Sequence, residues 1–458
     1  MSIENIGSVA KKDEKISKKI EQVTFNSIRK ALPDEAIVGA CQEADYKYRN
    51  RLITPIVTVM HMILTAIWPE QSFAASWQLL WSHAASRLDI SVKSPSLGSV
   101  AKARARLPVK LWSNLFEWIS QRGQNLSGRF DRWRGHRVIL ADGTCVSMSD
   151  KEELFKAFGT NYGYHGKGKY PLARLVTLCI ANTMMVMDYA FGRYNQDENA
   201  LLHPLLKKLQ KGDLLVSDRH FAGANYYCYY KSLGLEFLTR AHQCLKISRI
   251  KRIESYGRGD FLGWLIINKN HRKMNPDLPA KIMVRFIRAS MRIRNKTKSV
   301  WFITSLLDKD KYPADEVVVL YSKRWRIETF FRQLKINFSA DVLRSLTSDG
   351  IRKEVAARLI AMNIIRTIMI EAAIENGVEP DRISFVCTVR VVISFSPAFT
   401  DELFWKLPVI FKKMLIEIAS HLIDERPGRN EPRMIRRERQ HYPFMQIARC
   451  LWREKNVA

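Results

Sequence analysis

Apolar residues recur every three or four positions through much of the first 130 residues, a spacing typical of helices with one buried face. Three segments show the pattern clearly: Ile53 to Ile67, Phe73 to Leu88 and Val109 to Ile119. We therefore expect residues 1–130 to form an all-helical N-terminal domain.

One segment of this region is strongly basic. Ser96 precedes the run from Leu97 to Leu107, and serine is a favoured residue at the start of a helix. The run carries Lys102, Arg104 and Arg106. We expect a capped helix whose cations bind a polyanion, while a solvated helix face explains the same charges equally well.

The pattern changes at His136, where strand-like runs begin. The run from Arg137 to Thr144 contains Asp142 before a turn-forming glycine, and predicts a strand that ends in an acid. The run from Asp213 to Asp218 predicts a second strand of this kind. Between them we expect an antiparallel hairpin and then a helix. These elements cover Leu172 to Ala181, Met184 to Tyr194 and Glu198 to Leu209.

Residues 241–300 differ from their surroundings. Short alternating runs, such as Phe261 to Ile267 and Ile282 to Ile287, lie between turn residues, which indicates a β-rich segment. This segment holds 15 Lys or Arg and 3 Asp or Glu, a net charge of +12. We interpret it as a basic β-rich insertion in a larger domain.

The chain returns to core-like elements after this insertion. We expect a strand at Trp301 to Leu306 and helices at Asp315 to Phe338 and Ile351 to Ala373. Strands and helices within one domain place the protein in the α/β class. The expected organisation is a helical domain at 1–130, a core at 131–370 interrupted by the insertion, and a helical, basic C-terminal region at 371–458.

Charge identifies the class of partner. The formal net charge is +29, from 74 Lys or Arg against 45 Asp or Glu, which is more than solubility requires. A polyanion is the natural partner. A membrane is not expected, because the longest apolar stretch, Leu52 to Pro69, is short and contains His61 and Thr65. Met1 to Lys30 is polar and lysine-rich, so we expect a cytoplasmic protein.

Seven cysteines are spread along the chain and form no C-x-x-C pair. Structural zinc and a disulfide framework are therefore not expected, and buried thiols are the simpler interpretation.

The segment from Tyr321 to Lys335 carries the most specific local pattern. If it forms one helix, Tyr321, Arg324, Glu328 and Lys335 lie within about 60° of one another and make a polar stripe beside an apolar face. A solvated salt-bridge face is the ordinary explanation of such charges. A tyrosine, two cations and an acid in line also suit a metal ion and a phosphate.

Phosphodiester chemistry explains why three acids would be needed. The attacking oxygen must be deprotonated and the leaving oxygen stabilised, and two divalent ions about 3.5–4 Å apart do both. Magnesium prefers carboxylate oxygen. Asp142 and Asp218 at strand ends and Glu328 on a later helix can converge in this way. Either aspartate alone is more often a turn or cap residue.

These motifs, in this order, resemble a known family. The chain reads Asp142-Gly-Thr, then Ser-Asp218-Arg-His-Phe, then Tyr321-x-x-Arg324-x-x-x-Glu328-x-x-x-x-x-x-Lys335. This order resembles the DDE transposases of the insertion sequence four family, from about residue 30 to residue 370. The resemblance implies a ribonuclease-H-like mixed-sheet catalytic core with a β-rich insertion between the second aspartate and the glutamate.

The resemblance also implies roles for single residues. Asp142, Asp218 and Glu328 would be the metal ligands, for two Mg²⁺ ions with Mn²⁺ as a substitute. Tyr321, Arg324 and Lys335 would contact DNA phosphates. Trp301 stands where some members stack a tryptophan on a flipped base, and a core tryptophan in a strand is at least as good an explanation.

The function implied is cleavage at both ends of a mobile element and joining of its 3′ hydroxyl groups to target DNA, with a homodimer in the DNA complex. A structure-specific endonuclease would use the same metals without strand transfer. A basic DNA-binding protein without catalysis would keep the charge, and net charge does not separate these alternatives.

Overall fold

The computed structural model describes residues 26–49, 51–68, 72–85, 93–163, 166–293, 296–395 and 406–424. The arginine-rich tail expected from Arg426 lies outside these residues. The described residues up to Leu422 form one compact unit. Within the described ranges, no helix is both long and apolar enough to cross a bilayer.

Helices make up the described N-terminal part of the chain, as the apolar spacing predicts. The helix α4 is buried almost all round, and it begins where the Thr54 hydroxyl accepts from the Val57 N–H. The predicted cap at Ser96 is confirmed, because its hydroxyl accepts from the Ser99 N–H at 3.2 Å. The bounds are α2 Asn26–Ala31, α3 Asp34–Glu43, α4 Pro55–Ile67, α5 Phe73–Ala85, α6 Leu97–Arg106 and α7 Val109–Ser127.

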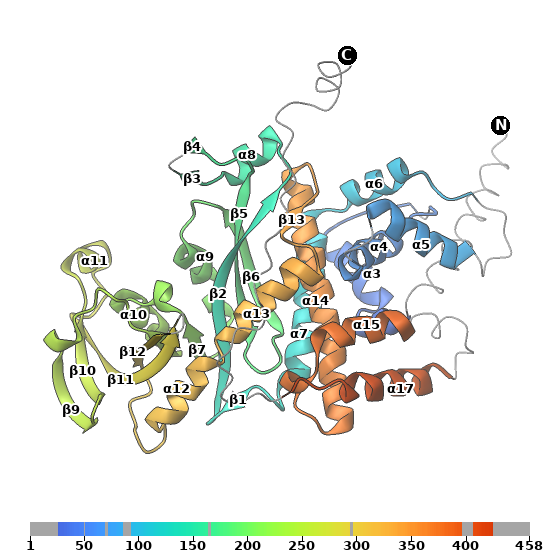
Figure 1. Ribbon diagram of the computed structural model, residues 1–458. Coiled ribbons are helices and arrows are strands. Elements are labelled where there is room, and N and C mark those ends of the chain that lie inside the picture. The colour runs from blue at the N-terminus through green and yellow to red at the C-terminus, as the bar shows by residue number, and fades with distance from the viewer. Residues whose placement is uncertain are drawn as a thin grey trace, which may run out of the picture. The chain divides into compact units, whose positions relative to one another are not determined.

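A mixed sheet forms the core (Figure 1). Its first five strands lie in the order β6-β5-β2-β7-β8. The strands β6, β5 and β2 are antiparallel neighbours, and β2, β7 and β8 are parallel neighbours. This order and these directions are those of a ribonuclease-H-like fold. The bounds are β2 His136–Met148, β5 Leu172–Ile180, β6 Val186–Arg193, β7 Leu214–Ser217 and β8 Glu236–Arg240.

The strand containing Asp142 is longer than predicted. The expectation that it ends at Asp142 is wrong, because β5 pairs with β2 as far as Ser147. On the other edge of β2, pairing with β7 stops at Ala141 and the short strand β13, Val342–Leu343, pairs only from Ser147. Asp142 therefore faces a gap in the parallel side of the sheet.

The basic segment at 241–300 is β-rich, as predicted, and it continues the core sheet. Its strands add in the order β12-β11-β10-β9, and β12 pairs antiparallel with β8. The segment also contains one short helix, α11, which the alternating pattern does not reveal. The bounds are β9 Lys251–Gly257, β10 Asp260–Ile266, α11 Lys269–Met274, β11 Lys281–Ile293 and β12 Lys296–Thr304.

The predicted helix from Asp315 to Phe338 is not continuous. It divides into α12, Ala314–Ser322, and α13, Trp325–Arg332, followed by a π-helical turn at Gln333–Asn337. Backbone bonds of the i to i+3 type replace the α-helical pattern at the break, as in the bond from the Arg324 N–H to the Tyr321 carbonyl. The Lys323 ammonium also binds the Asn182 side chain at 2.9 Å, which holds the turn against the β5–β6 connection.

Helices cover both faces of the core sheet (Figure 1). The helix α14, Ser348–Asn376, lies with α7 on one face, and α9 and α10 lie on the other. Most side chains of α14 are buried, among them every one from Lys353 to Ile370, so this helix is a central element of the core. The other elements are α9 Glu198–Leu205, α10 Ala224–Ser232, α8 Glu152–Phe158, α15 Phe385–Phe395, α17 Leu407–Ser420, β1 Arg132–Trp133, β3 Tyr162–Gly163 and β4 Gly166–Lys167.

Asn363 joins α14 to the sheet. Its side chain is fully buried, accepts from the Val186 N–H at 3.0 Å and donates to the Val186 carbonyl at 2.9 Å. Val186 begins β6, where the register with β5 shifts. Its N–H depends on the Asn363 side chain, whereas its carbonyl also accepts from the Ser120 hydroxyl at 3.0 Å. A buried backbone group without a partner costs about 1–3 kcal/mol.

We expect Asn363→Ala to lower the free energy of unfolding by about 1–3 kcal/mol, because it leaves the Val186 N–H without its partner while the carbonyl keeps its bond from Ser120. Denaturant unfolding followed by circular dichroism measures the effect. Asn376→Ala is the control on the same helix, since Asn376 is only partly buried, donates to the Ala372 carbonyl within its own turn at 2.9 Å and reaches the Leu415 carbonyl only at 3.5 Å. Equal losses in the two variants would contradict this role for Asn363.

Candidate active site

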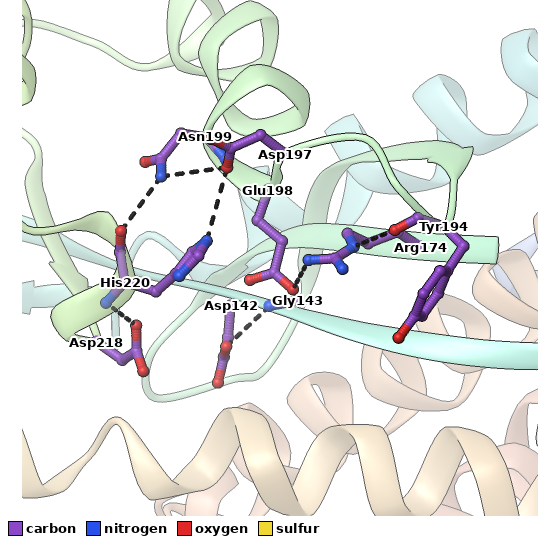
Figure 2. Close-up of polar contacts among 9 residues, drawn as sticks. All are labelled: Asp142, Gly143, Arg174, Tyr194, Asp197, Glu198, Asn199, Asp218 and His220. Atoms are coloured by element: carbon purple, nitrogen blue, oxygen red, sulfur yellow. Dashed lines mark hydrogen bonds and ion pairs between the residues drawn. The ribbon is translucent and has the colours of Figure 1, made fainter. Parts of the chain in front are cut away.

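The two aspartates predicted as ligands stand on neighbouring parallel strands. Ala141 pairs with Ser217 in the last register position of β2 and β7. Asp142 and Asp218 are the next residues on the two strands, whose backbones lie about 4.8 Å apart. The sheet therefore brings these two acids to the same place (Figure 2).

Asp142 is held in a largely buried position. Its side chain is 17% exposed, and one carboxylate oxygen accepts from the Gly143 N–H at 2.8 Å. Burial raises the pKa of Asp142 to about 6, and the negative charges of Asp218 and Glu198 add to the effect. The ionised form is therefore costly here unless a cation is near.

Asp218 caps the turn that follows its strand. One carboxylate oxygen accepts from the His220 N–H at 2.6 Å, and the short helical turn Arg219–Phe221 begins there. The turn contacts a cavity of about 550 Å³ lined by Asp218 and by polar residues of α9 and of the segment after β8. The second carboxylate oxygen of Asp218 takes no part in this cap.

Glu328 reaches the same site through an arginine. The Arg324 guanidinium donates to Asp142 Oδ2 at 3.2 Å and to Glu328 Oε1 at 2.7 Å. Arg324 is 11% exposed and Glu328 is 41% exposed. A single guanidinium thus spans the space between two of the three predicted ligands. Over the described residues, no three acids, histidines or cysteines stand close enough together to hold a metal ion directly.

The other residues of the predicted stripe have different surroundings. Tyr321 is buried, with its ring tilted against Phe302, and burial raises its pKa to about 12. Lys335 is half-buried in the π-helical turn, near Cys145 of β2. The interruption of the helix thus leaves Arg324 and Glu328 in contact and places Tyr321 in the core. Phosphate contacts by Tyr321 and Lys335 stay predictions.

Trp301 lies in β12, one strand beyond β8. Its ring packs edge to face on Phe261 with centroids 5.8 Å apart, and its side chain is half-buried. This contact supports packing within the sheet. Base stacking by Trp301 stays a prediction.

The predicted basic helix α6 forms one wall of a positively charged pocket. Lys102 and Arg106 line it, whereas Arg104 points elsewhere and lies over the Phe73 ring, 4.8 Å from its centroid. The pocket has a volume of about 720 Å³, and among the described residues no aspartate or glutamate lines it. The opposite wall is formed by the segment from Tyr46 to Ile53, and other cations of the lining are Lys47, Arg49, Arg51 and Lys93.

Two features of the site were missed by the sequence analysis. The segment Tyr46-Lys-Tyr-Arg-Asn-Arg51 alternates aromatic and basic residues, a signal of nucleic-acid binding that stands between two helices. Glu198 lies against Gly143 and binds Arg174, but an acid in the first turn of a helix is so common that no local signal marks it.

Comparisons with known proteins identify the family. A family model described as "Transposase DDE domain" matches residues 133–364, just over half of the chain. The transposase InsG for insertion sequence element IS4, from Escherichia coli strain K12, is 24% identical over 348 residues, which cover 75% of this chain and 77% of that protein.

A solved structure, the piggyBac transposase synaptic complex with hairpin DNA, has a TM-score of 0.41 and 11% identity, and covers 88% of this chain and 86% of the matched chain. A likeness this distant carries no argument. The family match spans the strands that carry Asp142 and Asp218 and the helix that carries Glu328. The chain belongs to the DDE transposases of the insertion sequence four family.

Proposed function

We propose that this transposase binds the terminal inverted repeats of its own element, cleaves the DNA at both ends and joins the 3′ hydroxyl groups to target DNA. The observation that carries the proposal is the register of β2 and β7, which brings Asp142 and Asp218 together beside the helix of Glu328. We further propose that the protein acts as a homodimer on DNA in the cytoplasm, since two element ends must be paired.

The residues of the site fit divalent metal. Three carboxylates form the donor set that magnesium prefers. Asp142 is largely buried beside a second acid, an arrangement that favours a bound cation. The Ser217 hydroxyl beside Asp218 is buried without a partner among the described residues, so the site retains unused polar capacity.

Asp142, Asp218 and Glu328 would hold two Mg²⁺ ions, or Mn²⁺ in their place. Bound metal would supply activation of the attacking oxygen and stabilisation of the leaving oxygen. Asp142 and Asp218 are fixed by backbone hydrogen bonds from Gly143 and His220, so their carboxylates are oriented before substrate binds. Preorganised groups of this kind lose little entropy in the reaction.

Arg324 would change partners during the reaction cycle. In the structure described here it neutralises Asp142 and Glu328. A DNA phosphate offers the guanidinium a bidentate acceptor of the same charge. Arg324 would then position the scissile strand, and Asp142 and Glu328 would be released from it to hold metal.

DNA would also bind the basic surfaces. The pocket between α6 and the Tyr46–Ile53 segment concentrates positive charge, and no ion pair joins its cations to a described residue. Such a surface favours a phosphate backbone. In the insertion, Lys251, Arg252 and Arg288 are exposed, whereas Arg285 is buried and paired with Asp260. Part of the positive charge of the insertion therefore stabilises the fold and is not available to DNA.

Glu328→Gln tests the chemistry. The change keeps the size of the side chain and removes the charge that would hold a divalent ion, so cleavage should fall by about two orders of magnitude or more while DNA binding survives. The measurement is excision from a plasmid carrying the gene with its flanking DNA, alongside gel-shift binding in calcium.

Glu417→Gln is the matched control, because Glu417 is a half-exposed acid in another i,i+4 pair, with His421. Excision should be unchanged in that variant. Excision at the unaltered rate in Glu328→Gln would favour the alternative of a basic DNA-binding protein without catalysis.

Lys102→Gln together with Arg106→Gln tests the pocket. Loss of two phosphate contacts should weaken DNA binding and reduce the slope of log affinity against log salt by about 0.9 per contact. Arg104→Gln on the same helix is the control and should leave the slope unchanged, since Arg104 lies over Phe73. An equal change of slope in the double variant and in Arg104→Gln would contradict DNA binding in this pocket.

A further inference from the structure

The basic pocket beside α6 differs in shape from a surface that only follows a phosphate backbone. It is concave, and its volume of about 720 Å³ lies within the range of about 300–1,000 Å³ that is typical of sites enclosing a small ligand. The helices α4 and α6, which supply part of its lining, lie side by side (Figure 1). A DNA duplex is a stiff rod, so it can touch the rim of such a hollow but cannot fill it.

Part of the pocket lining is apolar. Pro55, Ala103 and Leu107 line it and are buried, and Leu52 and Ile53 line it and are half-buried. A phosphate group gains nothing from apolar surface. The flat face of a nucleobase does, because contact with that surface removes it from water. The lining therefore suits a base as well as a phosphate.

Two tyrosines of the pocket lining form a stacked pair. The rings of Tyr46 and Tyr48 have centroids 6.1 Å apart and an angle of 23° between their planes. Tyr46 is half-buried and packs against the main hydrophobic core, whereas Tyr48 is 38% exposed. The core thus holds one ring, and that ring supports the other. An exposed tyrosine supported in this way is a platform on which a base can stack.

Cations surround this aromatic pair. The tyrosines alternate with Lys47 and Arg49 along the chain, and Lys102 and Arg106 line the pocket from α6. Each nucleotide of a single strand carries a phosphate next to a base, so cations that alternate with aromatic rings match its repeat. A free anion would need the cations but not the tyrosines.

Both walls of the pocket are fixed by contacts within the protein. The segment that carries the tyrosines is bonded at its start, where the Tyr46 N–H donates to the Cys41 carbonyl at 2.9 Å, and at its end, where Thr54 caps α4. On the other wall, the buried Lys353 of α14 donates to the Ala105 carbonyl of α6 at 2.9 Å. A pocket formed in advance loses little conformational entropy when it binds a ligand.

We propose that this pocket binds an unpaired nucleotide of the DNA, with the base stacked on Tyr48 and the adjoining phosphates bound by the surrounding lysines and arginines. The inference rests on the proposed function, since it requires that the protein acts on DNA, and it adds a site with a preference for unpaired DNA. Cleavage of a DNA end allows the terminal bases to unpair, and the pocket would hold the strand so released. The site belongs to the N-terminal helices and not to β12, which carries Trp301.

Tyr48→Leu and Tyr48→Phe in the full-length protein test the stacking. Tyr48→Leu removes the ring, so it should weaken the binding of a single-stranded oligothymidine of about ten nucleotides by about tenfold. Tyr48→Phe keeps the ring and should bind the oligothymidine as the unaltered protein does. Neither variant should change the affinity for a duplex of the same length. Fluorescence anisotropy at physiological salt measures both affinities.

Tyr162→Leu is the control, because Tyr162 is 78% exposed in β3 and does not line the pocket. It should leave both affinities unchanged. If Tyr48→Leu weakened the binding of single strand and duplex alike, or of neither, the proposal would be overturned.

Photocrosslinking locates the bound base directly. An oligothymidine in which 5-iodouracil replaces thymine should crosslink to Tyr46 or Tyr48, as identified by mass spectrometry of the digested protein. Crosslinks confined to other parts of the chain would overturn the proposal and leave the proposed function intact. The absence of binding to single strand and duplex alike would contradict the proposed function itself.

Discussion

The parallel pairing of β2 with β7 is the constraint on which the site depends. The pairing ends at Ala141 and Ser217, and the next residue along each chain segment is an acid, Asp142 or Asp218. Both acids therefore meet at one gap in the sheet. A shift of one residue in this register would turn Asp142 to the other face of the sheet. The buried pair of Arg137 and Asp213 at the other end of these strands helps to fix the register.

The acidic side chains at this gap form ion pairs with arginines. Two largely buried cations, Arg324 and Arg174, face the carboxylates of Asp142, Glu328 and Glu198. Each arginine has more than one partner: Arg324 binds two carboxylates, and Arg174 binds the Glu198 carboxylate and the Tyr194 carbonyl. The acids of this gap are therefore neutralised by arginines in the folded protein.

Much of the fold follows from the sequence because its periodicity is strong. The apolar spacing of Ile53 to Ile67 and Phe73 to Leu88 predicts α4 and α5, and the Asn182–Thr183 turn predicts the hairpin of β5 and β6. These elements depend on local patterns of burial. The motifs around Asp142 and Asp218 likewise identify residues that the sheet register places together.

The features that were missed depend on contacts between distant residues. The extension of β2 beyond Asp142 is stabilised by β5 and β13, and a glycine within a strand gives no local sign of it. The break at Lys323 reflects bonds to Asn182 across the fold. Arg104 and Lys102 are equivalent in a charge pattern, but only packing against Phe73 separates their roles.

The attachment of the insertion to β8 has an evolutionary consequence. Because β9 to β12 extend the sheet outward from one strand, antiparallel strands can be gained or lost in pairs at that border without changing the register of β2 and β7. Selection can therefore reshape these added strands while the acidic centre keeps its geometry. The sheet thus separates β9 to β12, which can diversify, from the paired strands β2 and β7, which cannot.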